Sequence, residues 1–321
     1  MRILLIKLIN GLLAGILAVT MFAVQAADLS IRTDYPLTKL TKNVQVIHGP
    51  NEEVSKQNQG FRNNPVIVTT SKGVVVIDPG SSVYIGEMIV NKVKTLTNKP
   101  IIAVFNTHGH GDHWLGNDGI RRHYPQAVIY GHEKMIQDIA GGDGDVWIKA
   151  INNRSEGAIE GTKIVAPNKA VKDGDRIKLG NITFRVYDVG AAHSHSDIML
   201  ELQEEKVFVF GDALRVKNLS PFMSSFSSNL KALKLGENRK AKVYIPGHGQ
   251  SGGKAIINEY RGFITTLKSE VSKYFEQGLS DFEMKPKIIT TLAKYKSWSG
   301  FDENIGRLIN LAYMEVEKES F

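Results

Sequence analysis

Six consecutive residues of this 321-residue chain gather the side chains best suited to metal chemistry. The run is His108-Gly109-His110-Gly111-Asp112-His113, and it holds three of the nine histidines in the chain. Imidazole and carboxylate together suit zinc, and neutral histidine is the commonest metal ligand. The alternative is a solvated, histidine-rich surface turn, which needs no partners elsewhere in the sequence.

Three further candidate ligands lie far downstream, each close to the end of a β-like or apolar segment and beside glycine. His193 follows the strand-like residues 182–187, Asp212 ends the apolar run 207–212, and His248 ends the run 243–248. Loops at strand ends can bring distant residues to one edge of a sheet sandwich. A zinc ion takes about four ligands, and a catalytic zinc leaves one position for water.

This order of ligands, His-x-His-x-Asp-His followed by His, Asp and His, resembles the metallo-β-lactamase-fold hydrolase superfamily. The segment Val76-Ile77-Asp78-Pro79-Gly80 is similar to the strand and turn that precede the metal loop in that superfamily. The resemblance runs over about residues 44–249. It implies an α/β fold, a four-layer αββα sandwich, to which the helical pattern beyond residue 253 adds appended C-terminal helices. The motifs are far more specific for the superfamily than for a substrate.

The resemblance also implies two zinc ions held by seven side chains. The first ion would take His108, His110 and His193, the second would take Asp112, His113 and His248, and Asp212 would bridge both beside a hydroxide. Elementary geometry agrees, because alternate residues of an extended loop point the same way and can share one ion. Two neighbouring cations repel each other, so a bridging carboxylate and hydroxide are needed to offset their charge.

Such a site predicts hydrolysis without a serine or cysteine nucleophile. Zinc lowers the pKa of bound water from 15.7 to about 7, and the hydroxide attacks a carbonyl carbon or a phosphorus. Asp112 is the candidate catalytic residue, assisting proton transfer beside the second ion. The expected reaction is cleavage of an ester, thioester, lactone or amide-type bond in a small molecule.

Four other residues are candidates for supporting roles. Asp78 is expected to brace the site rather than bind metal. Asp197 either hydrogen-bonds a zinc-bound imidazole or caps its loop. His195 is the alternative to His193 as ligand, a residue of the pocket wall, or a solvated or capping residue. Trp147 is either a wall for the substrate or an ordinary packed aromatic side chain.

Several alternative functions stay open at this stage. The chain has no cysteine, which excludes the true β-lactamases that bind the second zinc through Cys, but not other β-lactamases. A flavodiiron-like protein would favour a His-x-Glu-x-Asp loop, whereas this chain has His110 at the middle position. A mononuclear iron enzyme similar to persulfide dioxygenases remains compatible with His108, His110 and His193. The last alternative is a non-catalytic zinc-binding module.

The first 26 residues have the pattern of a secretory signal peptide. Arg2 and Lys7 precede an apolar stretch, and Val24-Gln25-Ala26 offers a small-residue cleavage site. Removing this segment lowers the formal net charge from +7 to +5. We expect a periplasmic or secreted protein without stable membrane association; its alternative is an uncleaved anchor. The mild charge and the absence of a basic run with aromatics argue against a nucleic-acid partner. The oligomeric state is left open.

The remaining sequence predicts how the chain is organised after residue 26. A metallo-β-lactamase-like domain is expected over 27–253 and a packed helical extension over 254–321. Residues 177–184 predict a hairpin that turns at Gly180-Asn181, and glycine-rich residues 140–147 predict a mobile loop carrying Trp147. The tail 304–317 is similar to exported metallo-hydrolases associated with quinoproteins and sulfur oxidation, or it is a generic amphipathic helix.

Overall fold

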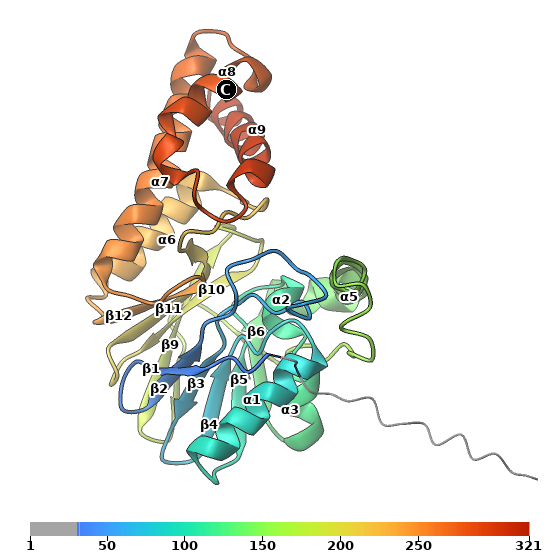
Figure 1. Cartoon of the computed structure of the whole chain (residues 1–321). Helices are drawn as coiled ribbons and strands as arrows, with labels where there is room; N and C mark the ends of the chain where they lie inside the picture. Colours follow the sequence, from blue (N-terminus) through green and yellow to red (C-terminus); the bar gives the residue numbers. More distant parts are fainter. Residues whose placement is uncertain (1–30, 32, 321) are drawn as a thin grey trace, which may run out of the picture.

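The computed structural model describes residue 31 and residues 33–320, and it folds around two facing β-sheets (Figure 1). The predicted signal peptide lies outside the described residues. The first sheet has the order β1-β2-β3-β4-β5-β6-β7. Its strands β1 to β4 pair antiparallel, and β4 to β7 pair parallel. The strands are β1 (Leu37–Lys39), β2 (Val44–Ile47), β3 (Val66–Thr69), β4 (Val74–Ile77), β5 (Ile101–Phe105), β6 (Val128–His132) and β7 (Lys169–Val171).

The second sheet has the order β12-β11-β10-β9-β8. Only its β11–β12 pair is parallel. The predicted hairpin is formed by β8 and β9, and Gly180 has a φ of +63° at its turn. The strands are β8 (Arg176–Leu179), β9 (Ile182–Gly190), β10 (Asp197–Leu202), β11 (Val207–Arg215) and β12 (Val243–His248).

Apolar side chains from both sheets meet in the middle of the sandwich. Alternate residues of a strand point to the same face, so Val66 and Val68 of β3 face inward together with Phe184 and Val186 of β9. The rings of Phe105 and Phe184 stack across the two sheets with centroids 5.3 Å apart. This inner layer holds the sheets in register at the edge where the candidate ligands lie.

Helices cover the outer face of each sheet, which confirms the predicted four-layer αββα sandwich. On the first sheet, Ile85, Ile89 and Val93 form one face of a helix and pack on β3 and β4. The helices before β10 are α1 (Val83–Leu96), α2 (Gly111–Trp114), α3 (Asn117–His123), α4 (Glu133–Asp138), a π-helical turn (Ile139–Asp143) and α5 (Gly144–Arg154). Helix α6 (Phe226–Asn238) lies between β11 and β12 in the chain and covers the second sheet.

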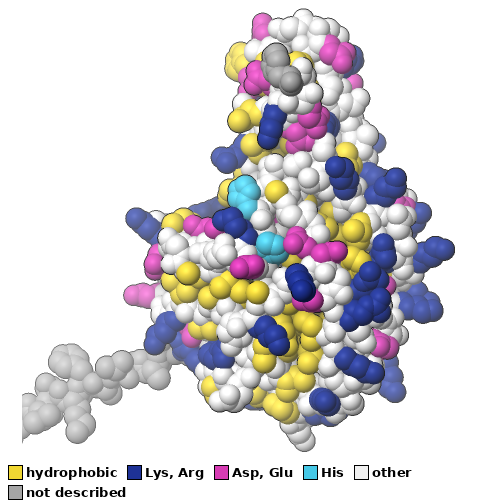
Figure 2. Space-filling view, turned by 180° about the vertical axis from the view of Figure 1, so that it is seen from behind, with side chains coloured by type: hydrophobic (Ala, Val, Ile, Leu, Met, Phe, Trp, Pro, Cys, Tyr) yellow, Lys and Arg dark blue, Asp and Glu magenta, His cyan; other side chains and the backbone are white. Residues whose placement is uncertain are grey.

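The C-terminal helices share one continuous apolar core with the second sheet. Phe208 and Phe210 of β11 belong to the same buried cluster as Phe263 and Ile305 of the extension. The elements are α7 (Lys254–Glu276), α8 (Asp281–Thr291), a 3₁₀ turn (Ala293–Tyr295) and α9 (Phe301–Glu319). They form a narrower lobe on the broader sandwich, in orange and red in Figure 1 and seen from behind in Figure 2. Of the helices described, none has the length and apolarity required to cross a membrane.

The prediction of a mobile loop over residues 140–147 is wrong, because this segment is helical. The π-helical turn runs through Ile139–Asp143 and leads directly into α5. Only Gly142 leaves helical geometry, with a φ of +116°. At Gly144 an added Cβ would lie 2.9 Å from Ile164, so glycine here permits close packing of the helix start rather than a turn. Trp147 is therefore carried by a helix.

Candidate metal centre

The seven predicted ligands meet at one end of the sandwich. His108 and His110 lie on the loop after β5, whereas Asp112 and His113 lie in the short helix α2. The turn between β9 and β10 brings in His193, and the two remaining residues belong to the parallel strands β11 and β12. They form two sets, each with its ligand atoms within 4.8 Å of one another: His108, His110, His193 and Asp212; and Asp112, His113 and His248.

Asp212 stands between the two sets. Its Oδ1 lies 3.2 Å from His113 Nε2 and 3.3 Å from His248 Nε2, and its Oδ2 lies 3.2 Å from His193 Nε2. Gly247 makes room for this carboxylate, since a Cβ there would lie 1.9 Å from Asp212 Oδ1. Each carboxylate oxygen therefore faces a different set of imidazoles.

Three of the imidazoles are fixed through the ring nitrogen that faces away from the centre. His108 Nδ1 lies 3.1 Å from Thr107 Oγ1, and His248 Nδ1 lies 2.9 Å from the carbonyl oxygen of Arg62. His113 Nδ1 lies 2.9 Å from a carboxylate oxygen of Asp78. Such contacts select the tautomer and leave the Nε2 lone pair directed at the centre.

Asp78 connects the metal loop to strand β4. Besides its contact with His113, its carboxylate accepts hydrogen bonds from Thr107 N over 2.8 Å and from Thr107 Oγ1 over 2.7 Å. Asp78 has a φ of +53°, a left-handed conformation that aspartate tolerates better than most residues. The residue lies behind the ligands and does not join either ligand set.

Asp197 contacts the backbone of the His193 turn rather than an imidazole. Its Oδ2 accepts hydrogen bonds from the backbone N–H groups of Ala192, His193 and Ser194 over 2.6–3.1 Å. Of the two roles considered for this residue, the structure therefore has loop capping. Burial raises the pKa of Asp197 to about 6, while these hydrogen bonds act in the opposite direction.

The electrostatics of the cluster suit a cation. Burial lowers the pKa of His108 and His193 well below the usual value and that of His110 to about 4. These rings are therefore neutral at pH 7 and can offer a nitrogen lone pair to a metal ion. Burial would raise the pKa of Asp212, but Arg215 and the neighbouring histidines hold it well below its usual range. Two buried atoms that face the centre, His108 Nε2 and Asp212 Oδ1, have no hydrogen-bond partner. A bound divalent cation would satisfy both atoms.

A pocket with two lobes opens beside the ligands. The outer lobe has a volume of about 410 Å³ and is lined by His193, His195 and Arg307, among other residues. The inner lobe has a volume of about 50 Å³ and lies beside Asp112 and Asp212. Four residues line both lobes and mark the boundary between them: His110, Trp147, Pro221 and Phe222.

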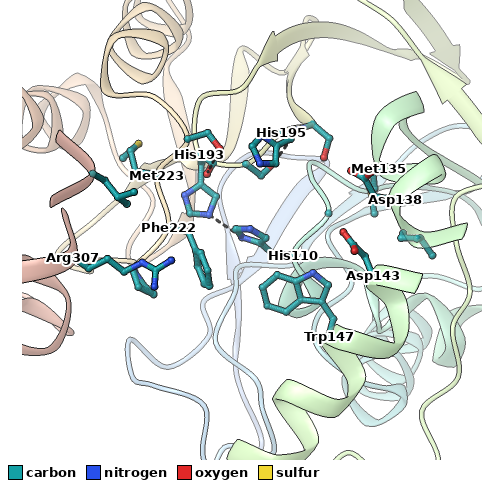
Figure 3. A pocket seen from close by; sticks show the side chains of 17 residues that line it. His110, Met135, Asp138, Asp143, Trp147, His193, His195, Phe222, Met223 and Arg307 are labelled. Atoms are coloured by element: carbon teal, nitrogen blue, oxygen red, sulfur yellow. Dashed lines mark hydrogen bonds between the residues drawn. The ribbon is translucent and has the colours of Figure 1, made fainter. Parts of the chain in front are cut away.

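Aromatic rings surround His110 at this boundary (Figure 3). The His110 ring centroid lies 4.8 Å from that of Trp147 and 5.0 Å from that of Phe222. Arg307 of the C-terminal helix α9 lies over the Phe222 ring at 5.7 Å. His195 is exposed on the outer lobe and is not part of either ligand set. On the face seen in Figure 2, histidine side chains reach the surface near the junction of the narrow lobe and the body.

The three histidines not assigned to the site have partners elsewhere. His48 Nε2 lies 3.0 Å from Ser251 Oγ, and His132 Nε2 lies 3.0 Å from Asp188 Oδ2. His123 Nε2 lies 2.6 Å from Glu87 Oε2. Among the described residues, the clustered histidines are therefore the five that belong to the two ligand sets.

Sequence reasoning missed the arginines and one aromatic residue of the pocket. Arg215 had a signal in the sequence, because it is the last residue of a strand that is apolar except for Asp212, three positions earlier. Phe222 and Arg307 had none, because a lone residue in an irregular loop or on an amphipathic helix carries no spacing pattern. The remaining pair, Arg62 and Arg154, comes from segments far apart in the sequence.

Comparison with known proteins agrees with the fold and the order of ligands. The model of the metallo-β-lactamase superfamily matches residues 59–248. A probable metallo-hydrolase of Streptococcus pyogenes is 26% identical over 202 residues, which cover 59% of this chain and 79% of that protein. A hydroxyacylglutathione hydrolase of Francisella tularensis is 27% identical over 158 residues, and the match spans about half of each protein, 49%.

A solved structure shows the same fold at low sequence identity. A metallo-β-lactamase from Pontibacter korlensis superposes with a TM-score of 0.58 at 19% identity, covering 72% of this chain and 99% of that one. The relatives named above are hydrolases by name. The superfamily match extends over more than half of the chain and includes every predicted ligand. This protein therefore belongs to the metallo-β-lactamase superfamily.

Proposed function

We propose that this protein is an exported dinuclear zinc hydrolase that cleaves an ester, thioester, lactone or amide-type bond of a small molecule. The observation that carries the proposal is the position of Asp212, with Oδ1 toward His113 and His248 and Oδ2 toward His193. A carboxylate in this position can be shared by two ions. The unpartnered buried atoms His108 Nε2 and Asp212 Oδ1 support the presence of cations.

Two zinc ions would lower the pKa of water toward neutrality and polarise the oxygen of the bond to be cleaved. The protein supplies the geometry for that chemistry. Asp78, Thr107 and the carbonyl oxygen of Arg62 orient the imidazoles, as described above. Asp112 lines the inner lobe, with Oδ2 3.3 Å from His248 Nε2, and we propose that its carboxylate assists proton transfer beside the second ion.

Activity toward β-lactams is the second candidate function. The fold shared with the Pontibacter β-lactamase favours it. The proposed export, to the compartment where β-lactams act, would favour it too. The carboxylate of Asp212 at the place of Cys in dedicated enzymes disfavours it, because negative charge repels a lactam carboxylate. We therefore propose weak lactam turnover beside faster cleavage of another ester, thioester or lactone.

Metal analysis of the mature protein tests the dinuclear centre. We expect nearly two equivalents of zinc after mild dialysis, and Asp212→Ala should lower the metal content and reduce turnover strongly. One equivalent of iron would instead support the mononuclear alternative. An Asp212→Ala variant with full activity and unchanged metal would contradict a bridging role.

A small substrate panel tests the reaction class. It contains a β-lactam, a lactone, a glutathione thioester and a phosphodiester, each measured with the zinc-loaded protein. A kcat/KM at or above about 10⁴ M⁻¹s⁻¹ on the β-lactam alone would identify a true β-lactamase. Zinc binding without turnover of any ester would support the non-catalytic module.

A further inference from the structure

We propose that Arg62, Arg154 and Arg215 form an anion-binding subsite in the inner lobe, so that the substrate carries a compact anionic group, a carboxylate or a phosphate or sulfate ester. This inference rests on the proposed hydrolase function and adds the substrate class. The three guanidinium groups come from separate elements: the loop before β3, the last residue of α5 and the end of β11.

Once Asp112 and Asp212 are engaged by the proposed cations, the three arginines carry more positive charge than Glu53 alone offsets. Glu53 is shared by two of them, with Oε2 3.1 Å from Arg62 Nη1 and 2.6 Å from Arg154 Nη2. Arg215 donates hydrogen bonds to Asp212 and Asn218. Among the described residues, no hydrogen bond joins Arg215 to Glu53. The charge of Asp212 is already required by the proposed cations. The lobe therefore retains net positive charge.

Two of these arginines are buried at a cost in solvation. Arg62 and Arg215 are 7% and 3% exposed, and the Nε atom of each is buried without a hydrogen-bond partner. Burying a charge is unfavourable unless it is paired, and the pairing here is incomplete. An anion in the lobe would supply the missing charge. The planar fork of arginine suits the two oxygens of a carboxylate, phosphate or sulfate.

The remaining charged groups of the pocket place the anion in the inner lobe. The carboxylates that line or contact the inner lobe are Glu53, Asp112 and Asp212, of which the last two are proposed metal ligands. The outer lobe has Asp138 and Asp143 against the single guanidinium of Arg307, so its formal charge is not positive.

The shapes of the lobes divide the substrate in the same way. An inner lobe of about 50 Å³ admits a compact headgroup, whereas the outer lobe of about 410 Å³ admits a larger organic part. His110 lines both lobes, so the bond to be cleaved would lie at their boundary. The anion is then either the scissile group itself, in a phosphate or sulfate ester, or a carboxylate next to a scissile carbonyl.

Arg154 offers the cleanest test because its side chain is 53% exposed and its loss leaves no buried cavity. In the zinc-loaded protein, Arg154→Gln should weaken binding of benzoate in calorimetry about tenfold, which corresponds to about 1.4 kcal/mol. Glu53→Gln should have the opposite effect and tighten benzoate binding, because it removes the competing carboxylate. Lys56→Gln is the matched control: it removes a nearby charge that pairs with Glu156 outside the pocket, and it should change nothing.

Kinetics with paired substrates give the second readout. Arg154→Gln should raise the KM for 4-acetoxybenzoate about tenfold and leave that for phenyl acetate unchanged. 4-Nitrophenyl phosphate and 4-nitrophenyl sulfate form the other arm; turnover of one of these with the same Arg154 dependence would identify the scissile group as the bound anion.

The outcomes separate this inference from the proposed function. Equal KM values for the charged and neutral acetate esters, with benzoate binding unaffected by Arg154→Gln, would overturn the anion subsite and leave the hydrolase intact. Weaker benzoate binding in Glu53→Gln would also overturn it, since Glu53 would then only hold the fold. Opposite responses of the two variants without any turnover would keep the anion subsite and refute the hydrolase.

Discussion

The Oδ2 atom of Asp78 lies 2.9 Å from Nδ1 of His113, and this contact links strand β4 to a proposed ligand of the second ion. Burial alone would lower the pKa of His113, but Asp212, Asp112 and Asp78 raise it well above the usual value. The same three carboxylates would favour a divalent cation in place of the proton. Asp78 would thus support the affinity of the centre for metal without being a ligand itself.

We predict that Asp78→Asn weakens binding of the second metal ion about 10- to 100-fold, the usual effect of losing such a partner. Asparagine tolerates the left-handed backbone at this position, so the change acts on the contacts of Asp78 with His113 and Thr107 rather than on the backbone. Titration of the metal-free protein with zinc measures the effect. Asp188→Asn is the control, because it removes an Asp–His contact with His132 outside the site. Unchanged affinity for both ions would show that Asp78 has no such role.

Trp147 is expected to contact the organic part of the substrate, since its ring lies beside His110 and lines both lobes. Trp147→Ala should raise KM about three- to tenfold for an aromatic ester, and Trp147→Phe should restore most of the affinity. Val146→Ala serves as the control, because Val146 is the exposed neighbour on the same helix. Equal KM values in the alanine variant and the unchanged protein would assign Trp147 to packing alone.

Glu315 of α9 is predicted to stabilise the fold in a pH-dependent way. Its carboxylate accepts hydrogen bonds from the backbone N–H groups of Phe226 and Ser227, at the start of α6, and from Lys268 Nζ. Burial would raise the pKa of Glu315, but these donors lower it below the ordinary 4.5. Its contribution is therefore complete above pH 4.5 and is lost as the pH falls through the lower pKa of the folded protein.

Glu315→Gln should accordingly lower the free energy of unfolding by about 1 kcal/mol at pH 7, with a smaller difference in acid. Denaturant unfolding at several pH values measures this. Glu259→Gln, at an exposed position of α7, should have little effect at any pH. A Glu315→Gln effect that grows toward low pH would contradict the assignment.

Export is predicted from residues 1–26 and is tested at the mature N-terminus. Mass spectrometry of the periplasmic fraction should show a chain that begins at Ala27, because Val24-Gln25-Ala26 provides the cleavage site. Full-length protein retained in the membrane would instead indicate an uncleaved anchor.

The sandwich and the order of candidate ligands could be predicted because each ligand lies at or near the end of a strand-like segment. Spacing within one short loop and repeated strand ends are local features, and they survive in a single sequence. The inner lobe could not be predicted, since Glu53, Arg62 and Arg154 become neighbours only after both the loop before β3 and α5 have packed. The three glycines of residues 140–147 predict a mobile loop, but the segment is helical, and Gly144 permits close packing against Ile164.

Helix α9 serves the pocket and the fold from different positions along its length. Arg307 and Leu311 line the outer lobe, whereas Glu315, further along, caps α6. Relatives that diverge toward other substrates should therefore exchange the residues at 307 and 311 together with the one at 222, on which Arg307 lies. Position 315 should remain acidic across the same divergence. Substitutions along α9 among relatives would thus distinguish the positions that set specificity, 307 and 311, from the position that stabilises the fold, 315.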